Sequence, residues 1–177
     1  MKVLPLLREL SRLKRNEKLS REQMLRLQEK KLRSMLHYAW DHSAFYRRTF
    51  QKAGITQAQL DTLPLTAFPS IDKALLMEHF DELITVSGVT QEDLRAFDQE
   101  NAADRKPLGG RYHVVHSSGS TGKPCYFLYD EAAWGTMLLG IIRGALWGMT
   151  MPEILKLLLG RPRVMYIAAT DGRYGGA

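Results

Sequence analysis

The sequence predicts an α/β fold in which a mainly helical region, residues 1–105, precedes the start of an α/β core, residues 106–177. Apolar residues recur at helical spacing through most of the first hundred residues. Two short strand-forming segments then flank a stretch rich in Ser and Gly. An apolar helix and a further strand-forming segment follow, which is the order of a right-handed β-α-β crossover onto a parallel sheet.

Three helices are predicted within the first 54 residues. The first carries an apolar stripe made of Val3, Leu6, Leu7, Leu10 and Leu13. Ser20 and Gln23 form a capping box for the second helix. Its predicted apolar face holds Leu25, Leu32, Met35, Leu36 and Ala39. Ser43 caps the third helix, Ala44–Lys52, and Gly54 ends it. The aromatic residues of this helix are predicted to pack in the core, with a substrate pocket as the alternative: Phe45, Tyr46 and Phe50.

Shorter elements are predicted along the rest of the chain. Ser70 is expected to cap a helix over residues 71–80, and Thr90 with Asp93 predicts a helix that reaches about residue 100. The polar segment 101–110 is the predicted boundary. The remaining predicted elements are strands at 111–116 and 125–129, helices at 130–149 and 153–159, and a strand at 163–169. The Gly-rich segment 171–176 follows that strand and is either a ligand-binding turn or a plain one.

The most informative segment lies between the first two strands and comprises Ser117, Ser118, Gly119, Ser120, Thr121, Gly122, Lys123 and Pro124. Glycines let the backbone approach a ligand closely, so that successive N–H groups form a nest for an anion. We expect phosphate contacts from Ser118, Ser120, Thr121 and Lys123. The segment therefore predicts a phosphate-binding loop, and a plain surface turn is the alternative.

The spacing differs from that of a Walker A loop. Only two residues separate Gly119 from Gly122, whereas a Walker A loop has four residues between its glycines. Pro124 lacks an N–H, and strand-forming residues follow it, so the loop joins two strands rather than opening a helix. We therefore expect a hairpin whose tip closes over a polyphosphate, and the pattern argues against a P-loop phosphotransferase.

The octet 117–124 resembles the phosphate-loop signature of the adenylate-forming enzymes, which include the acyl-CoA synthetases. Upstream, the segment YAWDHSAFYRRTFQKAG at residues 38–54, Leu63-Pro64 and Ile71-Asp72-Lys73 resemble the phenylacetate–coenzyme A ligase and CapK-like branch. The resemblance spans about residues 36–129, with weaker support to residue 176, and it is most specific in the octet.

This resemblance implies an AMP-forming acid–thiol ligase. In such an enzyme a carboxylate attacks the α-phosphorus of ATP, pyrophosphate leaves, and the acyl-adenylate passes to a thiol. The implied cofactors are ATP, Mg²⁺ and coenzyme A, and the implied partner is a small carboxylic acid, with aryl acids included. Residues 117–124 would bind the nucleotide, and no catalytic or metal-ligating residue is assigned.

The family's other nucleotide-binding and catalytic motifs follow the loop at a greater distance than this chain reaches. We therefore expect the chain to be an N-terminal portion, with the mixed sheet of the large domain truncated, and to be inactive by itself. The alternative is a non-catalytic nucleotide- or partner-binding module.

Composition and charge exclude several other classes of function. The 177 residues are 45% hydrophobic and 25% charged, as in globular proteins, and the net charge is +6. The basic residues concentrate in residues 1–53, where they mix with acidic ones and lack interleaved aromatics, so we expect a solvated helix face and no nucleic-acid polymer as partner. No apolar run reaches the roughly 20 residues of a membrane span. The apolar segments favour association, with a homodimer among the expected forms.

Two residue types suggest chemistry that we do not assign. Cys125 is the only cysteine, which excludes an intrachain disulfide and favours a buried, inert thiol in a cytoplasmic protein. His113 and His116 are predicted to share one face of a strand, but they lack the spacing and company of metal ligands.

Overall fold

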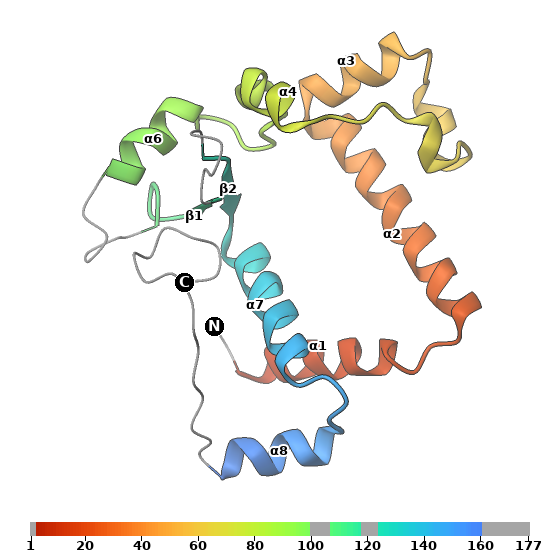
Figure 1. Ribbon diagram of the computed structural model, residues 1–177, viewed down its shortest axis with the longest axis vertical. Coiled ribbons are helices and arrows are strands. Elements are labelled where there is room, and N and C mark those ends of the chain that lie inside the picture. The colour runs from red at the N-terminus through yellow and green to blue at the C-terminus, as the bar shows by residue number, and fades with distance from the viewer. Residues whose placement is uncertain (1–2, 100–106, 118–123, 161–177) are drawn as a thin grey trace. The chain divides into compact units, whose positions relative to one another are not determined.

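The computed structural model describes residues 3–99, 107–117 and 124–160 (Figure 1). The chain divides into two compact units. One comprises residues 22–100, and the other combines residues 1–21 with residues 101–177. The first helix thus groups with segments more than a hundred residues away in sequence, which hydrophobic periodicity alone does not reveal.

The unit of residues 22–100 is helical in its described part. Its elements are α2 (Arg21–His42), α3 (Ala44–Lys52), η1 (Gln57–Asp61), η2 (Leu65–Ala67), α4 (Lys73–Glu78), α5 (Phe80–Leu83) and α6 (Gln91–Gln99). Its main core cluster is built from α2, α3 and the segment after them, and consists of Leu36, Trp40, Phe50, Ile55 and Leu60. The Trp40 and Phe50 rings stack with centroids 6.4 Å apart.

Helix α3 is confirmed with the predicted bounds. The Tyr46 N–H donates to the Ser43 hydroxyl at 3.4 Å, and Gly54 follows the helix with a φ of +74°. Phe45 and Phe50 are buried and Tyr46 packs against the core, so these aromatic residues are core residues, as predicted.

The predicted apolar face of α2 is partly wrong. Leu36 is buried, but Leu25 and Met35 are 54% and 64% exposed, and Trp40 is buried in their place. The reason is tertiary: the core of this unit covers only the C-terminal half of α2, on the side that carries Leu36 and Trp40.

The helix predicted over residues 71–80 is shorter and is divided. Asp72, not Ser70, is the N-cap of α4, because its carboxylate accepts the Leu75 N–H at 2.9 Å. Helix α4 ends at Glu78, and α5 begins again at Phe80. The helix predicted from Thr90 and Asp93 is confirmed as α6.

The unit of residues 1–21 and 101–177 holds α1 (Val3–Asn16), β1 (His113–His116), β2 (Tyr126–Tyr129), α7 (Glu131–Ala145) and α8 (Met151–Leu159). Helix α1 packs against α7, and the two lie close together in Figure 1. Leu10, Leu139 and Ile154 form their shared core, one residue from each of α1, α7 and α8.

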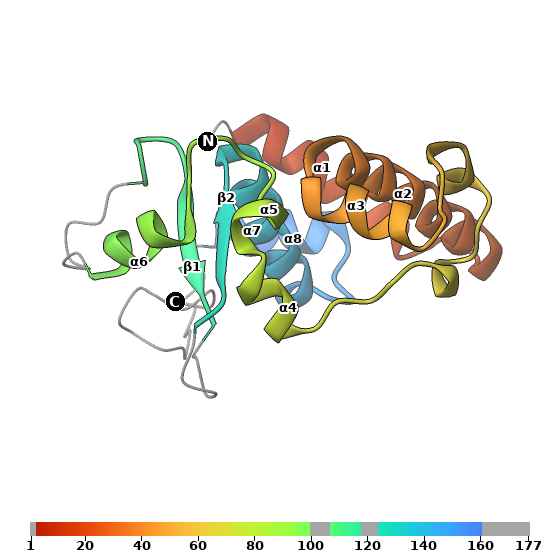
Figure 2. The ribbon, with the colours of Figure 1, turned by 90° about the horizontal axis from the view of Figure 1, so that it is seen from above.

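Strands β1 and β2 form an antiparallel pair and run side by side in Figure 2. The register pairs His113 with Tyr129 and His116 with Tyr126. The prediction that the octet joins two strands is therefore confirmed. The prediction that His113 and His116 share a face is wrong, because side chains three residues apart in a strand point to opposite faces.

The two helices predicted after the hairpin are present, but their bounds differ from the predicted ones. Asp130 caps α7, but α7 stops at Ala145, and Gly148 then takes a φ of +81° in the connection to α8. Helix α8 begins two residues earlier than predicted, because Thr150 and Glu153 form a capping box around Pro152.

The described residues thus form a helical N-terminal region followed by a small sheet, in agreement with the predicted α/β class. The strand predicted at 163–169, the crossover that would reach it and the segment 171–176 lie outside the described residues. Within the described ranges, no helix has both the length and the apolar character needed to cross a membrane.

Candidate functional site

The candidate site is the phosphate loop, residues 117–124, which connects β1 to β2. The structure describes its two ends, Ser117 and Pro124. The other predicted site residues lie outside the described part of the chain, and their contacts with phosphate stay a prediction: Ser118, Gly119, Ser120, Thr121, Gly122 and Lys123.

The two sides of the loop are joined where they leave the strands, at a point that we call the loop neck, formed by His116, Ser117 and Cys125. The Ser117 N–H donates to the Cys125 carbonyl at 2.9 Å. The Cys125 N–H donates to the Ser117 hydroxyl oxygen at 3.0 Å. These bonds hold the first and last residues of the connection together.

His116 adds a third hydrogen bond to the loop neck. Its Nδ1 lies 2.7 Å from the Ser117 carbonyl oxygen. Because a carbonyl oxygen only accepts, Nδ1 must carry the proton and donate. This bond fixes the orientation of the imidazole and occupies the Ser117 carbonyl.

The strands below the neck are anchored by buried residues on both faces and by an aromatic cluster at their far end. Val114, Val115 and Tyr126 are all buried. His113 stacks on Trp134 of α7, with ring centroids 4.6 Å apart and planes 11° from parallel. The His113 Nε2 lies 3.2 Å from a Glu131 carboxylate oxygen. The hairpin is therefore fixed to the first turn of α7.

Cys125 is buried, with 7% of its surface exposed, and it forms no disulfide. The structure therefore confirms the predicted burial of Cys125, while the inertness of its thiol stays a prediction. The Cys125 backbone also has a role in the loop neck that sequence reasoning missed. The signal that could have found it is the register: if the predicted strands continue to the loop, Ser117 falls opposite Cys125.

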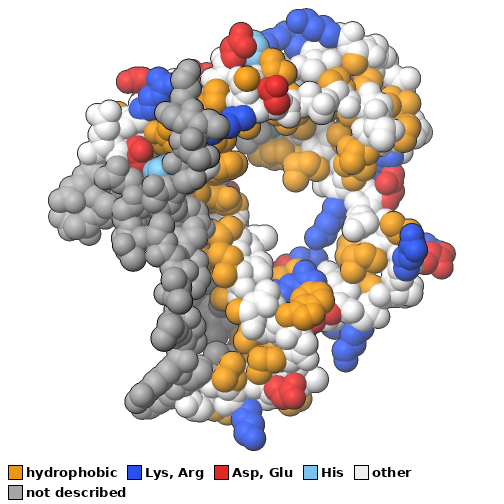
Figure 3. Space-filling view, viewed as in Figure 1, with side chains coloured by type: hydrophobic (Ala, Val, Ile, Leu, Met, Phe, Trp, Pro, Cys, Tyr) orange, Lys and Arg blue, Asp and Glu red, His pale blue; other side chains and the backbone are white. Residues whose placement is uncertain are grey.

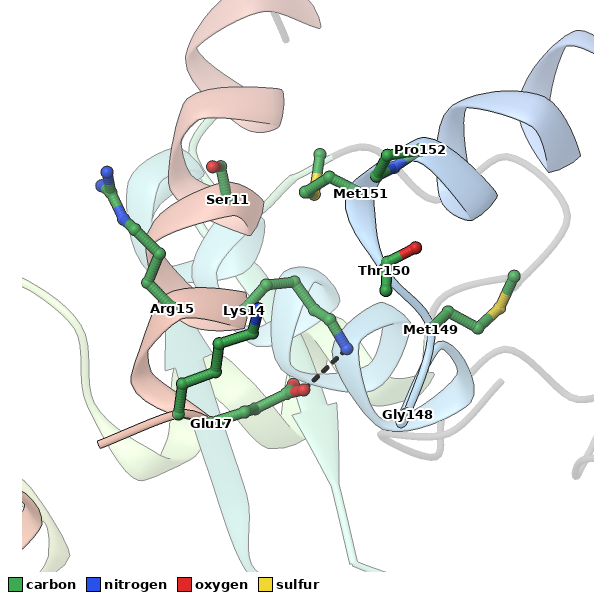
Figure 4. Close-up of a pocket in the computed structure, with 10 residues that line it drawn as sticks. Ser11, Lys14, Arg15, Glu17, Gly148, Met149, Thr150, Met151 and Pro152 are labelled. Carbon is green, nitrogen blue, oxygen red and sulfur yellow. Dashed lines mark hydrogen bonds and ion pairs between the residues drawn. The ribbon is translucent and has the colours of Figure 1, made fainter. Parts of the chain in front are cut away.

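A separate cavity of about 300 Å³ lies between the end of α1 and the α7–α8 connection (Figure 4). The Lys14 ammonium, in a side chain only 8% exposed, donates to a Glu17 oxygen at 2.7 Å and to the Leu146 carbonyl at 3.1 Å. The Arg143 Nε lies 3.2 Å from the other Glu17 oxygen. Lys14 and Glu17 thus satisfy each other, and their network ties α1 to α7.

The two neighbouring cations stabilise the ionised form of the Glu17 carboxylate. The hydrogen bond from Lys14, followed by that from Arg143, holds the pKa of Glu17 below its usual range. None of the residues of the loop neck lines this cavity, whose wall also contains Met149, Met151 and Pro152.

No cluster of three or more His, Cys, Asp or Glu side chains suited to a metal ion occurs among residues 3–99, 107–117 and 124–160. Mg²⁺ commonly binds through substrate phosphates and one or two carboxylates rather than in an all-protein cage. Binding of Mg²⁺ together with a nucleotide therefore stays a prediction for this chain.

Comparisons with known proteins find similarity among solved structures. No family model and no curated protein sequence matches the chain. Among solved structures, the chain is similar to a crystal structure of 2-hydroxyisobutyryl-CoA ligase in complex with 2-HIB-AMP and CoA, at 24% identity and a TM-score of 0.45. The match covers 67% of this chain and 22% of that chain, so this chain spans about a fifth of the ligase.

Proposed function

We propose that residues 117–124 hold the phosphates of ATP in an AMP-forming acid–thiol ligase of the phenylacetate–coenzyme A ligase kind. The observation that carries the proposal is the hairpin: the octet connects two paired antiparallel strands, and hydrogen bonds close its base. A Walker A loop would instead lead into a helix. The composition of the octet supplies the anion-binding groups.

The chemistry of the octet suits the departure of pyrophosphate. Negative charge accumulates on the leaving group as the carboxylate attacks the α-phosphorus, and preorganised donors stabilise charge that develops in the transition state. In the proposal, Ser118, Ser120 and Thr121 donate hydroxyls, while Lys123 places its ammonium beside the leaving oxygens. Bound Mg²⁺ would neutralise part of the same charge.

The loop's backbone provides the remaining donors. Gly119 and Gly122 allow successive N–H groups to turn toward one anion, and no side chain at these positions blocks its approach. The carboxylic acid, with aryl acids as the first class to test, and coenzyme A as acceptor rest on the resemblance of the octet and of residues 38–54.

Acid-dependent exchange between ATP and pyrophosphate tests this proposal, measured on the protein at its full coded length with a panel of aryl and aliphatic acids. We expect exchange that requires an acid. Lys123→Ala should lower the exchange rate by about 10- to 150-fold, the range for one charge-assisted hydrogen bond, with a smaller effect on acid affinity. Lys52→Ala, which removes an exposed lysine on α3, is the matched control and should leave the rate unchanged.

The other outcomes separate the alternatives. Binding of MgATP without exchange for any acid would contradict the ligase proposal and support a nucleotide-binding module. Absence of both binding and exchange would mean that residues 117–124 are an ordinary turn.

A further inference from the structure

We infer that Ser117 is a positioning residue, which redirects the backbone into the phosphate loop by replacing a strand hydrogen bond with its own side chain. The inference rests on the proposed function, and it reassigns Ser117 from the nucleotide-contacting residues to the loop neck. The reasoning starts from the register of the hairpin.

In an antiparallel hydrogen-bonded pair, two facing residues exchange both of their N–H to carbonyl bonds. Ser117 and Cys125 face each other one step beyond the His116–Tyr126 pair. The Ser117 N–H makes the expected bond to the Cys125 carbonyl, at 2.9 Å. The Cys125 N–H, however, donates to the Ser117 side chain, with its nitrogen 3.0 Å from Oγ.

The displaced partner, the Ser117 carbonyl, is not left without a donor. It accepts the Nδ1–H of His116 at 2.7 Å. The Ser117 carbonyl is therefore released from the strand ladder while it keeps a hydrogen-bond donor. The side chain of Ser117 and the ring of His116 thus replace the partners that a continued ladder would supply at residue 117.

This geometry assigns the Ser117 hydroxyl to the loop neck. Serine or threonine at residue 117 suits the arrangement, because the hydroxyl lies within reach of the Cys125 N–H. Alanine offers no such acceptor, so the Cys125 N–H would lose its bond or return to the Ser117 carbonyl. Either change alters the direction in which the phosphate loop begins.

The test compares Ser117→Ala, Ser117→Thr, His116→Phe and Ser120→Ala in the protein at its full coded length, the form in which the proposed function is tested. Two quantities are measured for each: the affinity for MgATP, and the hydrogen–deuterium exchange rate of the Cys125 amide. For Ser117→Ala we expect Cys125 exchange to accelerate at least several-fold and MgATP affinity to fall by about three- to tenfold. Ser117→Thr should restore both, and His116→Phe, which keeps a ring but removes the donor, should weaken MgATP binding. Ser120→Ala should lower affinity without changing Cys125 exchange.

Weaker MgATP binding by Ser117→Ala with unchanged Cys125 exchange would overturn the inference, because Ser117 would then act as a direct phosphate ligand. Failure of Ser117→Thr to restore binding in a chain that melts normally would also contradict it. If the wild-type protein at its full coded length binds no MgATP while Ser117→Ala still accelerates Cys125 exchange, the proposed function fails and the positioning role fails with it, but the neck bond itself is verified.

Discussion

Ser117 and Cys125 are bound to each other twice, once through the two backbones at 2.9 Å and once from the Cys125 N–H to the Ser117 hydroxyl at 3.0 Å. This relationship closes a connection of seven residues and fixes where the phosphate loop starts and ends. A loop with fixed ends loses less conformational entropy when it orders around a ligand. Substitutions then test what each loop residue contributes to binding.

Gly122→Val should lose MgATP binding more severely than Ser117→Ala. A β-branched residue resists positive φ and would obstruct the approach of a phosphate, whereas loss of the Ser117 hydroxyl removes one hydrogen bond. Calorimetric titration with MgATP, with thermal melting to check folding, measures the difference. Near-normal binding by Gly122→Val would show that residue 122 does not line a phosphate site.

Stability should fall in acid partly through Glu17. Its pKa is lowered in the folded chain by the hydrogen bonds from Lys14 and Arg143, so the unfolded chain binds a proton more readily. The contribution of Glu17 is therefore present above the unfolded carboxyl pKa of about 4.3 and is lost as the pH falls through the lower folded value. Glu17→Gln should flatten the decrease in melting temperature below about pH 4.3.

Glu22→Gln is the control for this experiment, because Glu22 pairs with Arg26 on the surface, where both side chains are 75% exposed. Its melting temperature should follow that of the unmodified chain across the titration. An acid dependence in Glu17→Gln identical to that of the unmodified chain would contradict the role given to the Lys14–Glu17–Arg143 network.

Two adjacent residues of α2 test the packing of the helical unit. Leu36→Ala should destabilise the chain by about 2–5 kcal/mol, because Leu36 is 7% exposed and belongs to the core. Met35→Ala should change stability by less than about 0.5 kcal/mol, since Met35 is 64% exposed. Denaturant unfolding measures both, and equal effects would show that the core lies on a different face of α2.

Hydrophobic side chains lie along α7 and over α8 on the face drawn in Figure 3. Ile141 of α7 and Leu159 of α8 are 44% and 85% exposed. Exposed apolar surface promotes association, so the chain should bind a hydrophobic dye and form dimers or larger species. The double variant Ile141→Gln, Leu159→Gln should reduce both signals in light scattering and dye fluorescence. A dye-negative monomer of the unmodified chain would contradict this expectation.

The sequence predicted much of the local structure, although two local caps, at Asp72 and Thr150, were missed. Ser43 and Gly54 set the two ends of α3, and both could be predicted from residue type. Tertiary determinants were missed. Nothing in α2 alone distinguishes Leu36 from Met35, and the i,i+3 spacing of Lys14 and Glu17 gives no sign of Arg143, which lies 126 residues away from Glu17.

The candidate site was likewise predicted only in part. The glycine spacing and Pro124 predicted a loop between strands, and the pairing of β1 with β2 confirms it. The exchange of a backbone bond for the Ser117 side chain could not be predicted, because a serine in a polar loop has the same residue type whether it contacts a ligand or its own backbone.

Amide NMR of the 177-residue chain during titration with magnesium pyrophosphate tests the central claim most directly, because it asks where an anion of the right chemistry binds. The account predicts saturable shifts concentrated in the amides of residues 117–123 and in Cys125, and their loss in Lys123→Ala. Shifts confined to the basic residues near the end of α1, such as Arg15 and Lys18, or no saturable shift at all, would contradict a phosphate-binding role for this loop.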